Sequence, residues 1–212
     1  MMPAQLRSLL FLGTLFLETL FLGGWPTALM AYAPMQPRQF MEPPPEAGFM
    51  LVASRKLADP RFRETVVLVT RNRHSGPIGI VINRPKDITL DKILPAHKGA
   101  EKFKLFAGGP VNPENISYLF RGEGSVAGTL KVSGQVYLSY NMSLLAELLS
   151  GARAHTGLRV VHGLAAWAPG QLENEIARGD WHVLPVNDEV IFDRPPADIW
   201  PELFRKATST SY

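Results

Sequence analysis

The chain contains no cysteine among its 212 residues. This absence excludes a disulfide framework, zinc–thiolate sites, iron–sulfur clusters and thiol nucleophiles. The sequence also lacks a phosphate-binding Gly-Lys-Ser/Thr loop, a Gly-x-Ser-x-Gly elbow and a His-Glu-x-x-His pair. The histidines, which have no metal-ligand spacing, are His74, His97, His155, His162 and His182. We therefore expect no metal and no cofactor, we recognise no catalytic constellation, and we interpret His162 as a core or strand-edge histidine.

Residues 122–127, Gly-Glu-Gly-Ser-Val-Ala, match a loose form of the dinucleotide-binding fingerprint. The fingerprint requires a helix after its last glycine, whereas β-branched, strand-like residues follow here. A glycine-rich hairpin is therefore the favoured interpretation of this segment.

Charged side chains are few and unevenly placed. They make up 19% of the chain, hydrophobic residues make up 46%, and the formal net charge is +3, as in an ordinary globular protein with one core. The stretch 55–86 is the basic part, with the cations Arg55, Lys56, Arg61, Arg63, Arg71, Arg73, Arg84 and Lys86 against Asp59 and Glu64. These charges could neutralise nucleic-acid phosphates. They mostly flank apolar strands without a helix-turn-helix spacing, so solvated strand ends are favoured.

An apolar leader precedes the globular part. Arg7 is followed by an apolar run at 9–22 that is interrupted by Glu18, and Ala31-Tyr32-Ala33 offers a small-residue cleavage site. The run is shorter than the roughly 20 residues that span a bilayer, as in a signal peptide. We expect residues 1–33 to export or anchor the protein. The alternative is a later translation start, which would make the leader an artefact and the protein cytoplasmic.

Residues 34–47 contain five prolines and are interpreted as an extended linker. A single α+β domain is expected over 48–195, followed by a C-terminal helix and tail over 196–212. Short apolar runs bounded by turn residues predict strands at 49–53, 65–70, 78–82, 104–106, 117–120, 128–132, 136–139, 158–162, 181–184 and 189–192. With more strands than helices and no strict βα alternation, the sheet should be mixed and mostly antiparallel, with a few short helices.

Three helices are predicted from caps and breakers. Asn141 or Ser143 can cap a helix that stops at Gly151. A second helix is expected to begin at Pro169 and end at Gly179. A third is expected at about 197–207, with an interruption at Pro201.

The segment 167–176, Trp-Ala-Pro-Gly-Gln-Leu-Glu-Asn-Glu-Ile, joins a tight turn to a short helix. Glu173 and Glu175 could suggest acid–base chemistry, but two residues apart on a helix they lie about 160° apart. Leu172 and Ile176 share a face, so a packing helix with acidic residues near its positive end is expected. The front edge is a candidate recognition surface made of Trp167, Pro169, Gly170 and Gln171.

Two further motifs lie at turns. Asn83-Arg84-Pro85 should end a strand, because Pro85 cannot donate to a sheet ladder. Arg84 could hold an anion or a partner's carboxylate, and a structural contact to a carboxylate is favoured. Gly108-Gly109-Pro110 is a glycine turn whose backbone amides could face an anion.

Several motifs follow one another in order after the linker, at residues 48–54, 59–62, 65–68, 76–85, 108–111 and 167–181. In this order and at these separations they resemble the bacterial AlgH/YqgE family. The resemblance implies an α+β fold around a mixed sheet. It also implies that most members of the family are cytoplasmic. Members have been described as transcriptional regulators by association with alginate regulation, and the resemblance implies no established reaction and no evident DNA-binding motif.

These observations favour a non-enzymatic regulatory or protein-interaction module over an enzyme. The candidate surface comprises Asn83, Arg84, Pro85, Gly108, Gly109, Pro110, Trp167, Pro169, Gly170 and Gln171, with exposed aromatic and arginine anchors beside glycine turns. One alternative is a small-anion binder or enzyme that uses Arg84 and the glycine turns. A second alternative is a nucleic-acid-binding regulator that uses residues 55–86. A protein partner is expected, and membrane contact is expected only through the leader.

Overall fold

The computed structural model describes residues 48–72, 76–122 and 127–209. The expected leader and linker, as well as His74, lie outside these described residues. Within the described ranges, no helix combines the length and hydropathy that a bilayer crossing requires.

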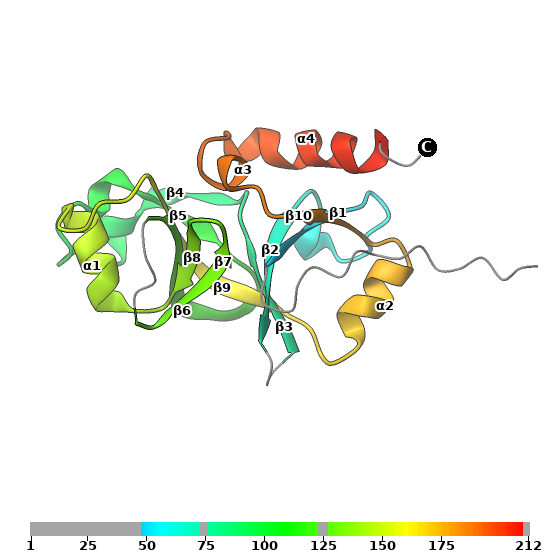
Figure 1. Cartoon of the computed structure of the whole chain (residues 1–212), viewed down its shortest axis with the longest axis horizontal. Helices are drawn as coiled ribbons and strands as arrows, with labels where there is room; N and C mark the ends of the chain where they lie inside the picture. Colours follow the sequence, from blue (N-terminus) through cyan, green and yellow to red (C-terminus); the bar gives the residue numbers. More distant parts are fainter. Residues whose placement is uncertain (1–47, 73–75, 123–126, 210–212) are drawn as a thin grey trace, which may run out of the picture. The chain divides into compact units, whose positions relative to one another are not determined.

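The described residues form one ten-stranded sheet (Figure 1). Its strands are β1 (Phe49–Ala53), β2 (Val66–Asn72), β3 (Gly76–Val81), β4 (Pro85–Thr89), β5 (Lys104–Ala107), β6 (Val111–Arg121), β7 (Thr129–Ser133), β8 (Val136–Ser139), β9 (Gly157–Ala166) and β10 (Trp181–Pro185). The order is β10-β1-β2-β3-β9-β6-β8-β7, while β5 lies between β4 and β9. Every pairing is antiparallel except that of β5 with β9, which is parallel. The predicted mixed, mostly antiparallel sheet is therefore confirmed.

Four α-helices accompany the sheet in the part of the chain that the structure describes: α1 (Met142–Ser150), α2 (Gln171–Ala177), α3 (Asp188–Phe192) and α4 (Pro196–Ser209). The predicted cap of α1 is confirmed, because Asn141 Oδ1 accepts from the amides of Ser143 and Leu144 at 3.0 and 3.2 Å. Gly151 ends this helix at φ +78°, where an L side chain would be strained.

Two apolar cores share the sheet. One packs α1 against β5, β6, β8 and β9 through Leu145, Leu148, Tyr118 and Phe120. The larger core joins β1, β2 and β3 to α2, α3 and α4, and it also includes side chains of β7 and β8. The Gly48 amide donates to the Val132 carbonyl on β7 at 2.9 Å, so the sheet curls until its β7 end meets the start of β1.

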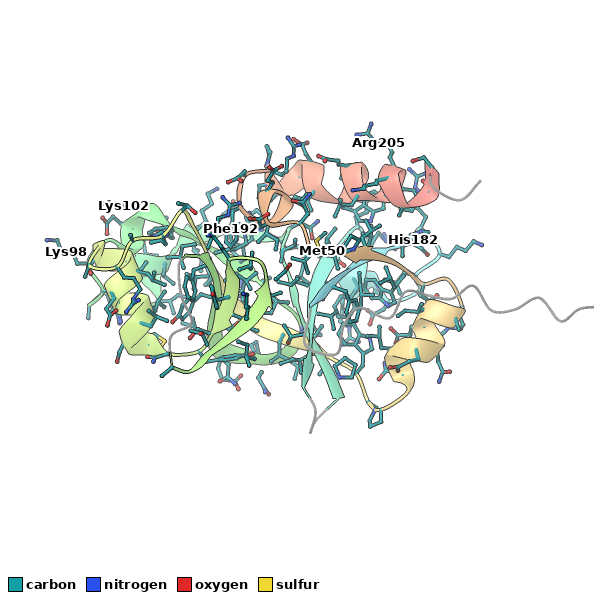
Figure 2. All side chains as sticks on the ribbon, in the orientation of Figure 1. Met50, Lys98, Lys102, His182, Phe192 and Arg205 are labelled. Carbon is teal, nitrogen blue, oxygen red and sulfur yellow. The ribbon has the colours of Figure 1, made fainter. Side chains whose placement is uncertain are left out.

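The long C-terminal helix α4 runs beside β1 and β10 (Figure 1). Its inner face buries Ile199, Trp200 and Leu203, and the Trp200 indole donates to the Ala53 carbonyl at 2.8 Å. His182 of β10 packs edge-on against Phe204, near the underside of this helix (Figure 2). The helix is therefore an integral wall of the larger core.

Three local predictions were wrong. Residues 189–192 form helix α3 rather than a strand, because Asn187 Oδ1 caps the Val190 amide at 3.3 Å. Helix α4 continues through Pro201, its sixth residue, where the proline removes one backbone hydrogen-bond donor from the helix. The strand before Asn83 does end as predicted, at Val81, but Pro85 does not stay outside the sheet: it opens strand β4 and pairs with Phe106, since a proline is tolerated as the first residue of a strand.

A glycine-rich hairpin was predicted at residues 122–127. Residues 123–126 lie outside the described residues, but the flanking strands do not pair with each other, because each pairs with β8. The next element after residues 123–126 is strand β7 and not a helix. This agrees with the rejection of the dinucleotide-binding fingerprint, which requires a helix at that place.

Candidate functional site

A pocket of about 260 Å³ opens beside the segment that begins at Trp167. Four parts of the chain enclose it: the loop 57–62, the start of β6, the end of β9 with α2, and the turn into β10. Its lining residues are Leu57, Ala58, Asp59, Arg61, Phe62, Pro110, Val111, Ala166, Trp167, Gln171, Glu175, Arg178, Asp180 and Trp181.

The floor of the pocket is organised around Glu175. Its Oε2 accepts a hydrogen bond from the Trp167 indole and another from the Trp181 indole, both at 2.9 Å. Its Oε1 accepts from the Gln171 side-chain amide, also at 2.9 Å. An ionised carboxylate only accepts hydrogen bonds, so three donors converging on it fix both indoles and the helix in one arrangement.

The sequence explains how this floor forms. Gly170 adopts φ +77°, which turns the chain into α2. Gln171 and Glu175 then lie one helical turn apart on the same face, which suits the hydrogen bond between them. Gln171 also accepts from the Ala168 amide through Oε1 at 3.1 Å, so both ends of its side chain are engaged.

The two tryptophans are held in mutual contact. Trp167 and Trp181 are 5% and 3% exposed, and their rings meet at 79° with centroids 6.3 Å apart. Phe62 adds a third ring at 5.8 Å from Trp181. Gly79 leaves room for Trp167, because a Cβ there would lie 3.0 Å from the indole and 2.5 Å from Val67. The floor is thus anchored in the larger core.

Two ion pairs stand at the rim. Arg61 contacts Asp59 at 2.7 Å, and Arg178 contacts Asp180 at 2.6 Å. The Arg61 guanidinium lowers the pKa of Asp59 through its hydrogen bonds, and Asp59 in turn raises the pKa of Arg61. The arginines are the outer partners: 64% of the Arg61 side chain and 61% of the Arg178 side chain are exposed, against 30% and 16% of their aspartates.

Asn83 and Arg84 support the loop that carries Arg61. Asn83 accepts from the Val66 amide and donates to the Glu64 carbonyl, both at 2.9 Å. Arg84 donates to the carbonyls of Arg61 and Arg63, and burial lowers the pKa of its guanidinium. Glu64 itself has φ +55°, a strained conformation that these contacts hold in place. The predicted contact of Arg84 to a carboxylate is instead a contact to two backbone carbonyls.

Gly108 and Gly109 lie where the chain crosses β9 closely. A Cβ on Gly108 would lie 2.4 Å from the Gly163 carbonyl oxygen, and one on Gly109 would lie 2.2 Å from the Leu164 backbone. The Gly108 amide donates to the His162 carbonyl at 2.8 Å, so this amide already has a partner. Close backbone packing against β9 therefore explains why both positions are glycine.

The structure brings together three of the sequence-predicted site residues, since Pro110, Trp167 and Gln171 line the pocket. Pro169 and Gly170 lie at the exposed turn before α2. The remaining predicted residues lie outside the lining: Asn83, Arg84, Pro85, Gly108 and Gly109. Their roles as a binding surface stay predictions.

Glu175, the centre of the floor, was not predicted as a site residue. Glu173 and Glu175 do not converge, as expected, since Glu173 is exposed and does not line the pocket. The available signal was the spacing of Gln171 and Glu175 on one helix face between two tryptophans. The packing role of Leu172 and Ile176 is confirmed by their places in the larger core.

The described histidines form no metal site. No group of three or more His, Asp or Glu side chains within the described ranges is arranged to hold a metal ion. His162 Nδ1 lies 3.0 Å from the Pro113 carbonyl oxygen, while its Nε2 has no hydrogen-bond partner among the described residues. It is a strand histidine with one satisfied nitrogen.

Comparison with known proteins gives a consistent match. A family model described as AlgH-like matches residues 50–211. A UPF0301 protein of Mycobacterium ulcerans is 32% identical over 170 residues, which cover 76% of this chain and 82% of that protein. A UPF0301 protein of Methylococcus capsulatus is 35% identical over 160 residues, which cover 73% of this chain and 85% of the relative.

Two solved structures share the fold. The solution structure of the AlgH protein from Pseudomonas aeruginosa superposes with a TM-score of 0.64 at 27% identity, covering 78% of this chain and 88% of that one. The crystal structure of a Corynebacterium diphtheriae protein gives a TM-score of 0.65 at 22% identity, with coverage of 77% and 88%. The second similarity concerns the fold alone.

Proposed function

The chain belongs to the AlgH-like family, and we propose that it is a non-enzymatic regulatory module that binds a protein partner through the pocket beside Trp167. The observation that carries this proposal is the combination of a rigid, hydrogen-bonded floor, apolar walls and an exposed arginine rim. Preformed concave sites with few polar groups are typical binding sites, and arginine and tryptophan are enriched where binding energy concentrates.

The arrangement of polar groups supports binding rather than proton transfer. Glu175 is the carboxylate at the floor, and both indole hydrogen bonds fall on one of its oxygens while Gln171 engages the other. The rim aspartates Asp59 and Asp180 each hold an arginine. These carboxylates therefore order the pocket's own side chains.

A pocket-blocking variant tests the proposal. Ala58 is exposed and lines the pocket, so Ala58→Trp should fill the opening without disturbing the floor. Ala152 is an exposed alanine beyond the end of α1 and outside the lining, which makes Ala152→Trp a matched control. We expect a stable partner that co-purifies from native cells to be lost with Ala58→Trp and retained with Ala152→Trp. Equal recovery with both variants would contradict the proposal.

The alternative functions stay predictions. A small-anion binder that uses Arg84 receives less support, because its guanidinium donates to two backbone carbonyls. Within the basic stretch, Arg61 is paired with Asp59, while Arg55 lies 5.2 Å from the ring centre of Phe204. Nucleic-acid binding by this stretch should be strongest at low salt, where an absence of binding would exclude it.

A further inference from the structure

We propose that the occupant of the pocket is an acidic protein segment that carries one apolar side chain. The apolar side chain enters the pocket, and the carboxylates beside it meet Arg61 and Arg178 at the rim. This inference rests on the proposed function and specifies the chemistry of the partner.

The size and lining of the pocket select an apolar anchor. A volume of about 260 Å³ exceeds the cavity of about 150 Å³ that accepts benzene, so one phenylalanine or leucine side chain fits. Leu57, Phe62, Pro110 and Val111 contribute apolar walls. Both indole N–H groups of the floor already donate to Glu175, so a polar side chain that entered the pocket would find no free indole donor there.

The rim presents guanidinium edges to an incoming anion. Arg61 uses Nε and Nη2 to reach Asp59, and Arg178 uses the same two nitrogens to reach Asp180. Nη1 of each arginine has no hydrogen-bond partner among the described residues. A guanidinium has five N–H donors in a rigid fork, so an aspartate can orient it while another edge binds a second carboxylate.

The loop 55–64 has a net positive charge, with four cations against Asp59 and Glu64 (4 − 2 = +2). Arg55, Lys56 and Arg63 are exposed on the same loop as Arg61. Lys56 and Arg63 have no carboxylate partner within the described part of the chain. A net positive loop that contributes one wall of the pocket raises the encounter rate with a negative segment and opposes a positive one.

The tryptophans argue against single-stranded nucleic acid as the occupant. Sequence-tolerant binding of single strands relies on exposed aromatic faces on which bases stack. Trp167 and Trp181 are only 5% and 3% exposed, and their rings pack against each other. The pocket thus offers a niche for a side chain rather than a stacking platform.

Fluorescence anisotropy with a fluorescein-labelled peptide, Asp-Asp-Phe-Asp-Asp, tests the inference on the full-length protein. Two matched peptides replace either the phenylalanine with glycine or the aspartates with lysines. We expect only the first peptide to bind, with a Kd that rises with salt because the rim arginines are exposed. Arg61→Gln and Arg178→Gln should each raise the Kd by about three- to tenfold, and Ala58→Trp should abolish binding.

The controls separate the partner's chemistry from the fold and from the proposed function. Arg153→Gln removes another arginine that is paired with a glutamate, away from the pocket, and should leave the Kd unchanged. Arg178→Glu provides a second test should Ala58→Trp not fold, and it should abolish binding. Equal binding of the lysine or glycine peptide, or tighter binding of a labelled single-stranded oligonucleotide that Ala58→Trp blocks, would overturn the inference.

Failure of all peptides while Ala58→Trp still prevents partner co-purification would refute the acidic segment and leave the proposed function standing. Co-purification that is unaffected by Ala58→Trp would refute the proposed function itself.

Discussion

Replacing Glu175 with glutamine should destabilise the protein more than its small size change suggests. The wild-type carboxylate accepts three hydrogen bonds at 2.9 Å, two of them from the buried tryptophans Trp167 and Trp181. Glutamine keeps one acceptor oxygen for the indoles, but the two hydrogen bonds are weaker because the acceptor no longer carries a negative charge. Its new amide group would face the amide of Gln171, which cannot reverse without leaving the Ala168 amide unpaired.

Hydrogen bonds to charged groups contribute about 1.5–3 kcal/mol and neutral ones about 0.5–1.5 kcal/mol. Two weakened indole bonds and one lost amide bond, partly offset by easier burial of a neutral group, give a destabilisation of about 2 kcal/mol. For a domain of this size, that loss lowers Tm by about 4–8 °C. Urea unfolding followed by tryptophan fluorescence measures the free energy of unfolding directly.

Glu173→Gln is the matched control, because it removes the same charge from the same helix at an exposed position. It should cost about 0.5 kcal/mol or less, through its contribution near the helix amino terminus. Equal losses for Glu175→Gln and Glu173→Gln would refute the view that Glu175 organises the floor of the pocket.

Gly79→Ala should cost about 1–3 kcal/mol of unfolding free energy by overpacking, because the new Cβ would lie 2.5 Å from Val67 and 3.0 Å from Trp167; an unchanged urea midpoint would contradict this. Burial lowers the pKa of His182 below its ordinary value, so as pH falls the unfolded chain is protonated at a higher pH than the folded protein. Protonation therefore favours unfolding, and the stability that neutral His182 allows is lost as pH falls from about 6.5 through the folded pKa. Tm should therefore fall less between pH 7.5 and 5.5 in His182→Gln than in the wild type, and parallel curves would refute this assignment. If residues 1–33 export or anchor the protein, the native protein should either lack them by intact mass or remain in the membrane fraction. A full-length protein outside that fraction would contradict this expectation.

Much of the fold could be predicted because local patterns and tertiary packing agree. The strand at 49–53 is apolar throughout and buried throughout, and the cap at Asn141 and the stop at Gly151 define α1 in both sequence and structure. Predictions were wrong where a neighbour decided the outcome. Residues 189–192 are apolar enough for a strand, yet the Asn187 cap makes them helical. Strand β4 forms because β5 offers it a partner, which Pro85 alone does not reveal.

The candidate site shows the same division between local and long-range information. Trp167 and Gln171 were accessible from the sequence because they belong to one punctuated segment. The rim was not, because Arg61 and Arg178 are more than a hundred positions apart and line the same pocket only because β1 pairs with β10. Arg159, which does not line the pocket, was not predicted as a buried charge for a similar reason: it lies inside β9, donates to the Ile82 carbonyl and lies 4.5 Å from the ring centre of Phe106. Its burial lowers the guanidinium pKa to about 10, so it remains charged at neutral pH.

Site-specific photo-crosslinking in native cells tests the central claim most directly. A photoreactive phenylalanine analogue at Ala58 places the reactive group at the pocket, and the same analogue at Ala152 places it outside the lining. We predict a protein crosslink from position 58 but not from position 152, with the attached partner peptide containing an apolar residue flanked by aspartates or glutamates. No crosslink from position 58, or equal crosslinks from both positions, would contradict the pocket as the partner-binding surface.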